Sequence, residues 1–275
     1  MLEISAGVMT ASLAPKLGGV VMRLSHDGRD LLRPACSADA VAEDPREAAC
    51  FPCVPWFSRL AGGLDFEGRH YDLAPTLPAC DPHHALHGEG WINPWKVTAQ
   101  TQDRLECRFD HRPRPGKFPF AFSATQTFAV TERAFAIDLT VTNKSDTPMP
   151  AGLGLHPYFP RLDATLLRAT ASRCWAADDT GNWRETPMPA ELNFSAPRAL
   201  PSRDADEALI GWDGELTIAA EKTIRMTSSA RLIHVFAPAG ADFFCLEPLT
   251  QAPACFGETI LPPNGSLDLS MTISV

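Results

Sequence analysis

Alternation of apolar and polar residues is the strongest pattern along the chain. The segment 267–275, LDLSMTISV, changes character at every residue. Its apolar positions are Leu267, Leu269, Met271, Ile273 and Val275. Because side chains along a β-strand point alternately to its two faces, this segment is predicted to be a strand with one buried face and one wet face. The segment 135–143, FAIDLTVTN, shows the same pattern.

Similar patterns predict strands over most of the chain. FSATQTFAV, just before Thr131-Glu132-Arg133, is the expected hairpin partner of 135–143. Further strands are predicted at 2–12, 18–25, 94–109, 215–220, 231–237 and 242–247. The best helix candidate, 39–49, is interrupted by Pro45. We find no repeat or linker, so the sequence predicts an all-β fold: one large antiparallel β-sandwich that forms a single domain over residues 1–275.

Composition and charge narrow the choice of partners. The formal charge of −9 and a pI near 5.3, without a Lys/Arg cluster, argue against nucleic acid as a partner. The opening MLEISAGVMTASLAP has neither the basic start nor the continuous apolar run of a signal peptide, and no later run is long enough for a membrane span. We therefore expect a cytoplasmic protein without a membrane partner, either a monomer or a homodimer.

The chain has eight cysteines, scattered along its length. Without a signal peptide, they are expected to be reduced thiols rather than a disulfide framework. Cys50 and Cys53 form a CxxC motif among apolar residues, which could indicate redox chemistry or half of a zinc site. No second CxxC follows, so we interpret these cysteines as structural.

Two titratable groups precede prolines at the apparent ends of apolar runs. His156 lies in GLGLHPYFP before Pro157, and Glu247 ends DFFCLE before Pro248. Both are expected at strand ends, because proline lacks an N–H and biases the preceding residue toward extended backbone. A carboxylate in a cleft can act as a base. The alternatives are a buried histidine with a backbone partner and an ordinary acid at an exposed strand edge.

A third segment, HALHGEGWINPW, combines His87 with glycines and with Trp91 and Trp95. Polar groups beside indoles suit a sugar, whose ring offers an apolar C–H face as well as hydroxyls. Arg59, in VPWFSRLAGG, is a single cation among apolar and glycine-rich segments. It is either a site residue or a surface residue whose stem covers the core.

Taken in order, the motifs resemble those of the aldose 1-epimerase (galactose mutarotase-like) family over most of the chain. LAPKLGGVVMRLSHDGRDLLRP is similar to the family's first hairpin, FPCVPWFSRLAGG to its Asn-Arg segment, and HALHGEGWINPW to its His-Gly…Pro-Trp motif. GLGLHPYF resembles its His-Pro-Tyr-Phe, DADEALIGWDG its Asp…Trp-(Asp/Asn)-Gly region, and CLEPLTQAPACF its Glu-Pro-x-Thr segment. This resemblance implies the family's large β-sandwich.

The resemblance also implies roles for individual residues. Anomer interconversion removes the proton of the C1 hydroxyl and protonates the ring oxygen, so no cofactor or metal is expected. The family's base maps to Glu247 and its acid to His156. His87 would hold the sugar and polarise its ring oxygen, and Arg59 and Asp206 would bind hydroxyls. Trp91 would offer an apolar surface to the substrate.

Departures from the family pattern bear on the substrate. Ser58 stands where the family often has Asn, Leu209 where many members have an aromatic, and Trp91 where many have arginine. Because Arg59 is the one cation in the motif segments that follow the first hairpin, we expect neutral free aldoses rather than sugar phosphates.

Three alternatives stay open at this point. The protein could be a sugar-phosphate mutarotase, or a non-catalytic carbohydrate-binding protein of the same fold. His83, His84 and His87 could instead form the metal cluster of a hydrolase, although histidines so close together in a loop rarely converge on one ion.

Overall fold

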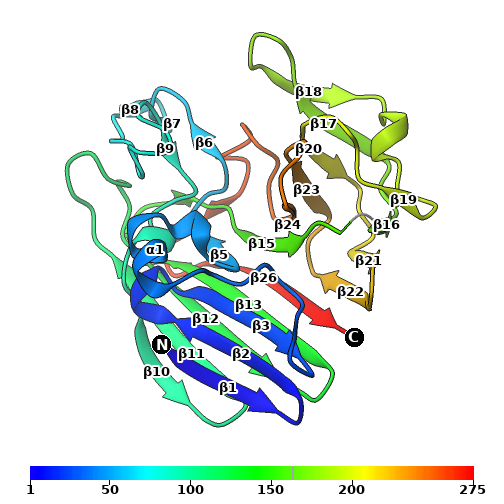
Figure 1. The fold of residues 1–275 in the computed structure, drawn as a ribbon. Coiled ribbons are helices and arrows are strands. Elements are labelled where there is room, and N and C mark those ends of the chain that lie inside the picture. The colour runs from blue at the N-terminus through cyan, green and yellow to red at the C-terminus, as the bar shows by residue number, and fades with distance from the viewer. Residues whose placement is uncertain (163) are drawn as a thin grey trace.

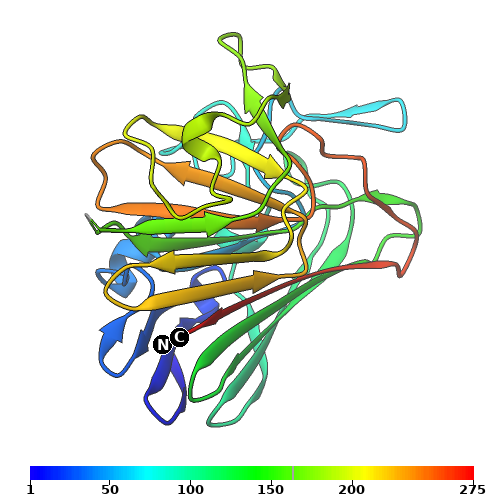
Figure 2. The ribbon, with the colours of Figure 1, turned by 90° about the vertical axis from the view of Figure 1, so that its right-hand side faces the viewer.

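The structure is a computed structural model that describes residues 1–162 and 164–275 (Figure 1). Its strands form two large antiparallel sheets that pack face to face, which confirms the predicted all-β sandwich. In Figure 1 the blue strands near the N-terminus lie over the green strands of the other sheet, and Figure 2 shows the two layers from the side.

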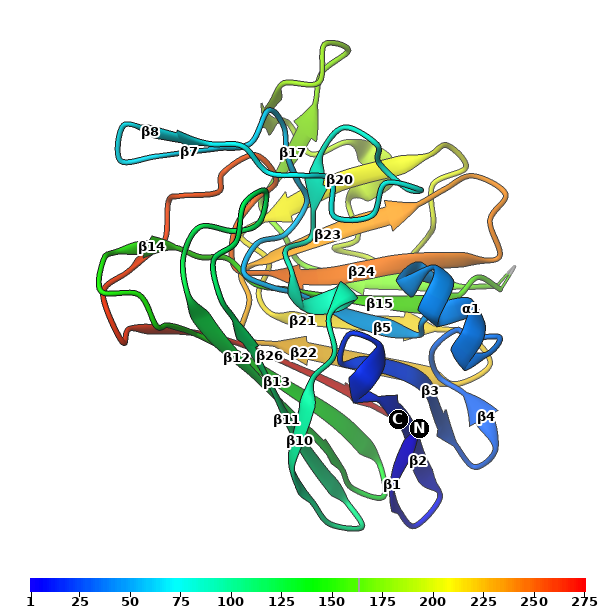
Figure 3. The ribbon, with the colours of Figure 1, turned by 90° about the vertical axis from the view of Figure 1, so that its left-hand side faces the viewer.

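The first sheet contains the central strands on which the site is built. Its order is β1 (Leu2–Ala6), β2 (Met9–Ala14), β3 (Val20–His26), β5 (Cys50–Cys53), β15 (Gly154–Pro160), β24 (Phe243–Leu249), β23 (Leu232–Ala237), β20 (Ala205–Ile210), β17 (Arg173–Ala177) and β18 (Trp183–Thr186), with β4 (Arg29–Asp30) beside β3. Figure 3 shows β5, β15, β24 and β23 as neighbours.

The second sheet supplies the other half of the sandwich. Its order is β10 (Lys96–Gln100), β11 (Arg104–His111), β12 (Phe122–Val130), β13 (Ala134–Asn143), β26 (Ser266–Ser274), β22 (Thr223–Ser228), β21 (Glu215–Ala219), β16 (Leu166–Ala169) and β19 (Arg198–Ala199).

Shorter elements connect the sheets. Small strand pairs are β6 (Arg59–Leu60) with β9 (Ala85–Leu86), β7 (Leu64–Phe66) with β8 (Arg69–Tyr71), and β14 (Met149–Pro150) with β25 (Ile260–Leu261). The helical segments are α1 (Ala38–Glu43) and the 3-10 turns η1 (Pro15–Leu17), η2 (Pro45–Glu47), η3 (Gly90–Ile92) and η4 (Ala190–Leu192). Among the described residues, no helix is both long and apolar enough to cross a bilayer.

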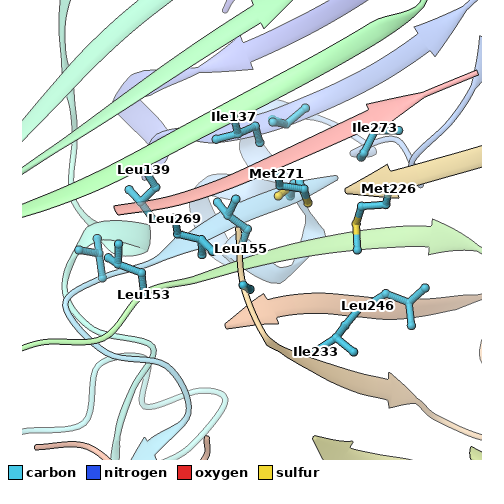
Figure 4. Close-up of a cluster of buried hydrophobic side chains, with 14 of the residues drawn as sticks. Ile137, Leu139, Leu153, Leu155, Met226, Ile233, Leu246, Leu269, Met271 and Ile273 are labelled. Carbon is cyan, nitrogen blue, oxygen red and sulfur yellow. The ribbon is translucent and has the colours of Figure 1, made fainter. Parts of the chain in front are cut away.

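The core lies between the two sheets (Figure 4). From the first sheet it takes Leu155, Ile233 and Leu246, and from the second Ile137, Leu139, Leu269, Met271 and Ile273. Since side chains alternate along a strand, the residues next to the first group point to the opposite face of the first sheet. These residues are His156, His234 and Glu247.

The observed strands confirm the alternation argument and correct it in two places. The segments 135–143 and 267–275 are the adjacent strands β13 and β26, with Ile137 opposite Met271. The predicted strands 2–12 and 94–109 are each a hairpin instead, β1–β2 and β10–β11. Because a tight turn takes up only a few residues, the alternation of apolar and polar residues continues from one strand of the hairpin into the next. Proline divides 39–49 as expected, because α1 ends before Pro45 and η2 follows.

The expectation that His156 and Glu247 end their strands is wrong. Both lie inside central strands, and the prolines after them, Pro157 and Pro248, continue those strands. Pairing between β15 and β24 is found at Gly154 and again from Tyr158 onward, with a gap at 155–157 among the described pairs. Proline cannot donate to a ladder, and it is tolerated here because the ladder opens beside the two site residues.

Candidate active site

A cavity of about 410 Å³ opens on the face of the first sheet that points away from the core. Its floor is a row of side chains set by the strand register. Phe51 of β5 pairs with His156 of β15, and His234 of β23 pairs with Glu247 of β24. The sequence-predicted residues that line the cavity are Arg59, His87, His156, Asp206 and Glu247.

His156 and Glu247 face each other at the centre of this floor. His156 Nε2 lies 3.4 Å from Glu247 Oε1, and their side chains are 8% and 1% exposed. Burial lowers the pKa of His156 well below its usual value, and the nearby charges of His87 and His234 add to this. Burial, with the charge of Asp206, raises the pKa of Glu247 well above its usual value. The 3.4 Å distance would suit an ion pair. The two pKa shifts instead favour a neutral imidazole and a protonated carboxyl group, so the two groups together hold one proton.

The Glu247 carboxylate is poised to accept a hydrogen bond from a ligand. Both of its oxygens are buried and have no hydrogen-bond partner among the described residues. An unsatisfied buried carboxyl group costs stability, so its persistence indicates a functional reason.

Aromatic rings fix the orientation of the His156 imidazole. Phe51 stacks on it with ring centroids 4.4 Å apart, and Tyr158 stacks with centroids 4.8 Å apart. Two residues before His156 on β15, Gly154 allows Phe57 and Leu249 to approach, since a Cβ there would lie 2.9 Å from Phe57 Cδ2 and 3.0 Å from Leu249 Cδ2.

His87 is held in one tautomer by its contacts. The amide of Ser58 donates to His87 Nδ1 at 3.2 Å, and the thiol of Cys53 lies 3.3 Å from the same nitrogen. Burial, with the charges of Arg59 and His234, lowers the pKa of His87 to about 3. The ring is therefore neutral at physiological pH, and its Nε2 carries the proton as a hydrogen-bond donor.

The glycine after His87 has a steric cause. Gly88 has a φ of +75°, and a Cβ on it would lie 2.0 Å from the carbonyl oxygen of Val54. Only glycine lets the chain turn this closely against the segment before Arg59, and the turn brings His87 into the cavity wall.

Arg59 is positioned by an ion pair at the cavity rim. Its Nε donates to Asp81 Oδ2 at 2.7 Å, while the other oxygen of Asp81 accepts the amides of His83 and His84. Only one edge of the guanidinium is used in this pair, so further N–H groups are available to a ligand.

Asp206 reaches the cavity from β20 and is bound by a residue that the sequence argument missed. His234 Nε2 lies 2.7 Å from Asp206 Oδ1. Burial by itself would raise the pKa of Asp206, but the hydrogen bond from His234 and the charges of His234 and Arg59 outweigh it, so the pKa lies below its usual value. The carboxylate is thus ionised and fixed. The available sequence signal was a single histidine within the otherwise apolar run LIHVFA.

Trp91 does not offer a surface to the cavity, contrary to expectation. Its side chain is 0% exposed, and its indole N–H donates to the carbonyl oxygens of Leu86 and Gly88. Trp91 stacks on Phe51 with centroids 5.0 Å apart and so supports one residue of the floor. Aromatic walls are provided instead by Phe57, Tyr158, Phe236 and Phe243.

The structure also bears on the alternative roles considered for the CxxC motif and for the three histidines at 83, 84 and 87. Cys50 and Cys53 belong to different apolar clusters on opposite sides of the first sheet, which does not allow a CxxC disulfide in this strand. All eight cysteines of the described chain are free thiols. His83, His84 and His87 do not gather into a ligand cluster within the described residues, and of the three only His87 lines the cavity.

The fold of this chain is that of a known protein family. Residues 1–246 match the aldose 1-epimerase family, and the chain belongs to it. The chain is 32% identical over 252 residues to the uncharacterized protein YphB of Escherichia coli K12, covering 86% of this chain and 83% of YphB.

Solved structures are similar over nearly the whole chain. The putative aldose 1-epimerase of Escherichia coli K12 superimposes with a TM-score of 0.87 at 29% identity, covering 99% of this chain and 97% of that one. The GalM/aldose epimerase homologue of C. elegans gives a TM-score of 0.82 at 19% identity, with 99% and 97% covered, which supports the fold alone.

Proposed function

We propose that the protein is an aldose 1-epimerase that interconverts the α and β anomers of a free aldose. The observation that carries this proposal is the His156–Glu247 pair, a buried acid and base 3.4 Å apart on the floor of the cavity of a chain from this family. The cavity volume of about 410 Å³ lies within the range of small-molecule sites, ~300–1,000 Å³.

The proton balance of the reaction matches this pair. Glu247 takes the proton of the C1 hydroxyl while His156 gives a proton to the ring oxygen, and the C1–O5 bond breaks to leave the open-chain aldehyde. Rotation about C1–C2 presents the other face of the aldehyde. Ring closure then returns both protons, so the enzyme ends in its starting state.

Sugar binding itself favours the ionised carboxylate that this step needs. In the empty site, burial favours a protonated Glu247. A sugar hydroxyl that donates to a carboxylate oxygen stabilises the charged form and lowers the pKa, and the proton can pass across the 3.4 Å to His156. His87, as a neutral donor, would support the ring oxygen, and Arg59 and Asp206 would hold hydroxyls.

The charges around the cavity favour a neutral sugar. Besides Arg59, the lining includes Arg33, which belongs to the first-hairpin segment, and Arg46, which lies outside the motifs. Arg46 is already paired with Asp44, and Arg33 donates to the carbonyl oxygens of Arg46 and Ala48 while it stacks on Tyr158. Because these cations have partners and Glu47 adds a negative charge, a dianionic phosphate gains little here.

Polarimetry tests the proposal. Freshly dissolved α-aldoses, galactose and glucose first, are followed with and without the protein, and the protein should speed the approach to the equilibrium rotation. A non-catalytic sugar-binding protein would instead bind aldoses and leave this rate at its spontaneous value. That result would contradict the proposal.

A further inference from the structure

Cys245 is a buried thiol beside the site that the proposed reaction does not use. It lies on β24 two residues before Glu247, so the two side chains share a face, and it pairs with Tyr158 of β15. Its side chain is 0% exposed and its thiol is free.

Three different donor atoms converge at this point. One ligand atom each from His156, Cys245 and Glu247 lie within 4.8 Å of one another, and His156 Nε2 is 3.4 Å from Glu247 Oε1. In a tetrahedral zinc site with metal–ligand bonds of about 2.0–2.3 Å, neighbouring ligand atoms are roughly 3.3–3.8 Å apart. Small side-chain rotations would bring the three atoms to these separations.

The donor atoms are largely uncommitted. Both oxygens of Glu247 are buried and have no hydrogen-bond partner in the described part of the chain, and the His156 nitrogen that faces them, Nε2, lies 3.4 Å from Oε1. An arriving cation therefore breaks few existing bonds. It can reach the site through the cavity, because His156 and Glu247 line it.

The charge balance suits a divalent cation that prefers nitrogen and sulfur. A thiolate and a carboxylate together cancel two positive charges, which leaves a neutral complex in a buried place. The metal must displace the thiol proton of Cys245 and the proton held by the His156–Glu247 pair, so binding must weaken as the pH falls. Imidazole, thiolate and carboxylate are the ligands of Zn²⁺, whereas Mg²⁺ prefers oxygen alone.

We infer that His156, Cys245 and Glu247 form a binding site for Zn²⁺ or a cation of similar ligand preference, which inhibits the protein by occupying its acid and its base together. The inhibition rests on the proposed mutarotase function, and the binding does not. The ion is an inhibitor here and not a cofactor of the reaction.

Calorimetric titration of chelator-treated protein with ZnCl₂ tests the binding. The wild type should bind one ion per chain, and MgCl₂ should give no signal. Loss of an outer-shell partner already costs a zinc site about 10–100-fold in affinity, so Cys245→Ala should weaken binding at least tenfold. Cys107→Ala is the matched control, because Cys107 is an equally buried thiol on β11 of the other sheet. Unchanged zinc affinity in Cys245→Ala would overturn the site.

A spectroscopic measurement distinguishes loss of the metal site from misfolding of the variant. Co²⁺ bound by a thiolate gives a sulfur-to-metal charge-transfer absorption, which the wild type and Cys107→Ala should show. Cys245→Ser, which keeps the side-chain volume nearly unchanged, should lose this band while its circular dichroism stays native. A band that survives in Cys245→Ser would place the metal at another thiol.

Activity assays test the second part of the inference, that bound zinc inhibits the protein. Zinc should abolish turnover of the wild type and Cys107→Ala, and a chelator should restore it. Cys245→Ala should turn over sugar without zinc and require at least tenfold more zinc for inhibition. Full turnover with zinc bound would overturn the inhibition. Normal zinc binding by a protein that has no activity under any condition would instead refute the proposed function and leave the site in place.

Discussion

His156 Nε2 lies 3.4 Å from Glu247 Oε1 across two adjacent antiparallel strands, and both side chains are buried. Their pKa values move in opposite directions because burial disfavours both charges. The pair therefore behaves as one unit that holds one proton, which is what a reaction with simultaneous proton removal and delivery requires.

Replacing Glu247 should separate activity from stability. Glu247→Gln keeps the shape of the side chain and removes the base, so we expect the rate above the spontaneous reaction to fall by on the order of a hundredfold or more, with sugar binding largely retained. Glu89→Gln is the matched control, since Glu89 is a buried carboxylate outside the cavity lining. Wild-type turnover in Glu247→Gln would remove this residue from the mechanism.

The same variant should be more thermostable than the wild type. The folded pKa of Glu247 is raised above its unfolded value of about 4.3, so the wild type loses stability as the pH rises from that value through the folded pKa. Glutamine does not titrate. The Tm advantage of Glu247→Gln should therefore grow as the pH is raised above about 4.3, which scanning calorimetry at several pH values measures. An advantage that shrinks over this range would contradict the assigned shift.

The pH dependence of kcat/KM should be bell-shaped. The proposed reaction needs one proton on the pair, so activity should be lost when the pair gains a second proton or loses its only one. Because burial lowers the pKa of His156, the acid limb should lie below the ordinary histidine value of about 6.5. His87, with a pKa of about 3, should contribute no limb near neutrality, so His87→Gln should reduce kcat/KM and leave the profile between pH 5 and 8 unchanged in shape.

His234 should act through Asp206. Loss of a hydrogen bond to a charged group costs about 1.5–3 kcal/mol, so His234→Phe should raise KM roughly tenfold or more with a smaller effect on kcat. His234→Gln, which can place an amide N–H near the position of Nε2, should recover much of the lost affinity. Equal loss in both variants would show that the imidazole has another role.

All eight cysteines should titrate as free thiols in denatured protein prepared without oxidant. Cys50 and Cys53 lie in different apolar clusters, so their CxxC spacing does not bring the sulfurs together. Reductant should leave the activity unchanged. Loss of activity on adding reductant would reveal a disulfide that matters for function.

Neutral sugars should be preferred over their phosphates. The cavity cations Arg33 and Arg46 already have protein partners, Arg59 is partly neutralised by its ion pair with Asp81, and the chain carries a net charge of −9. We expect kcat/KM for glucose to exceed that for glucose 6-phosphate at equal ionic strength. A clear preference for the phosphate would make the protein a sugar-phosphate mutarotase.

The sequence by itself determined the fold class and most of the site. Alternation in 135–143 and 267–275 specified strands with one buried face, because burying one face of a sheet requires that period. The ordered motifs brought in Arg59, His87, His156, Asp206 and Glu247, all of which line the cavity.

Only the tertiary structure decided which face each residue occupies and what lies beside it. Proline after His156 and Glu247 suggested strand ends, but pairing with neighbouring strands overrides that local preference. Trp91, four residues after the motif histidine, is buried against Phe51, while His234 comes beside Glu247 through strand register. Such contacts join residues far apart in the chain, and local sequence contains no information about the distance between them.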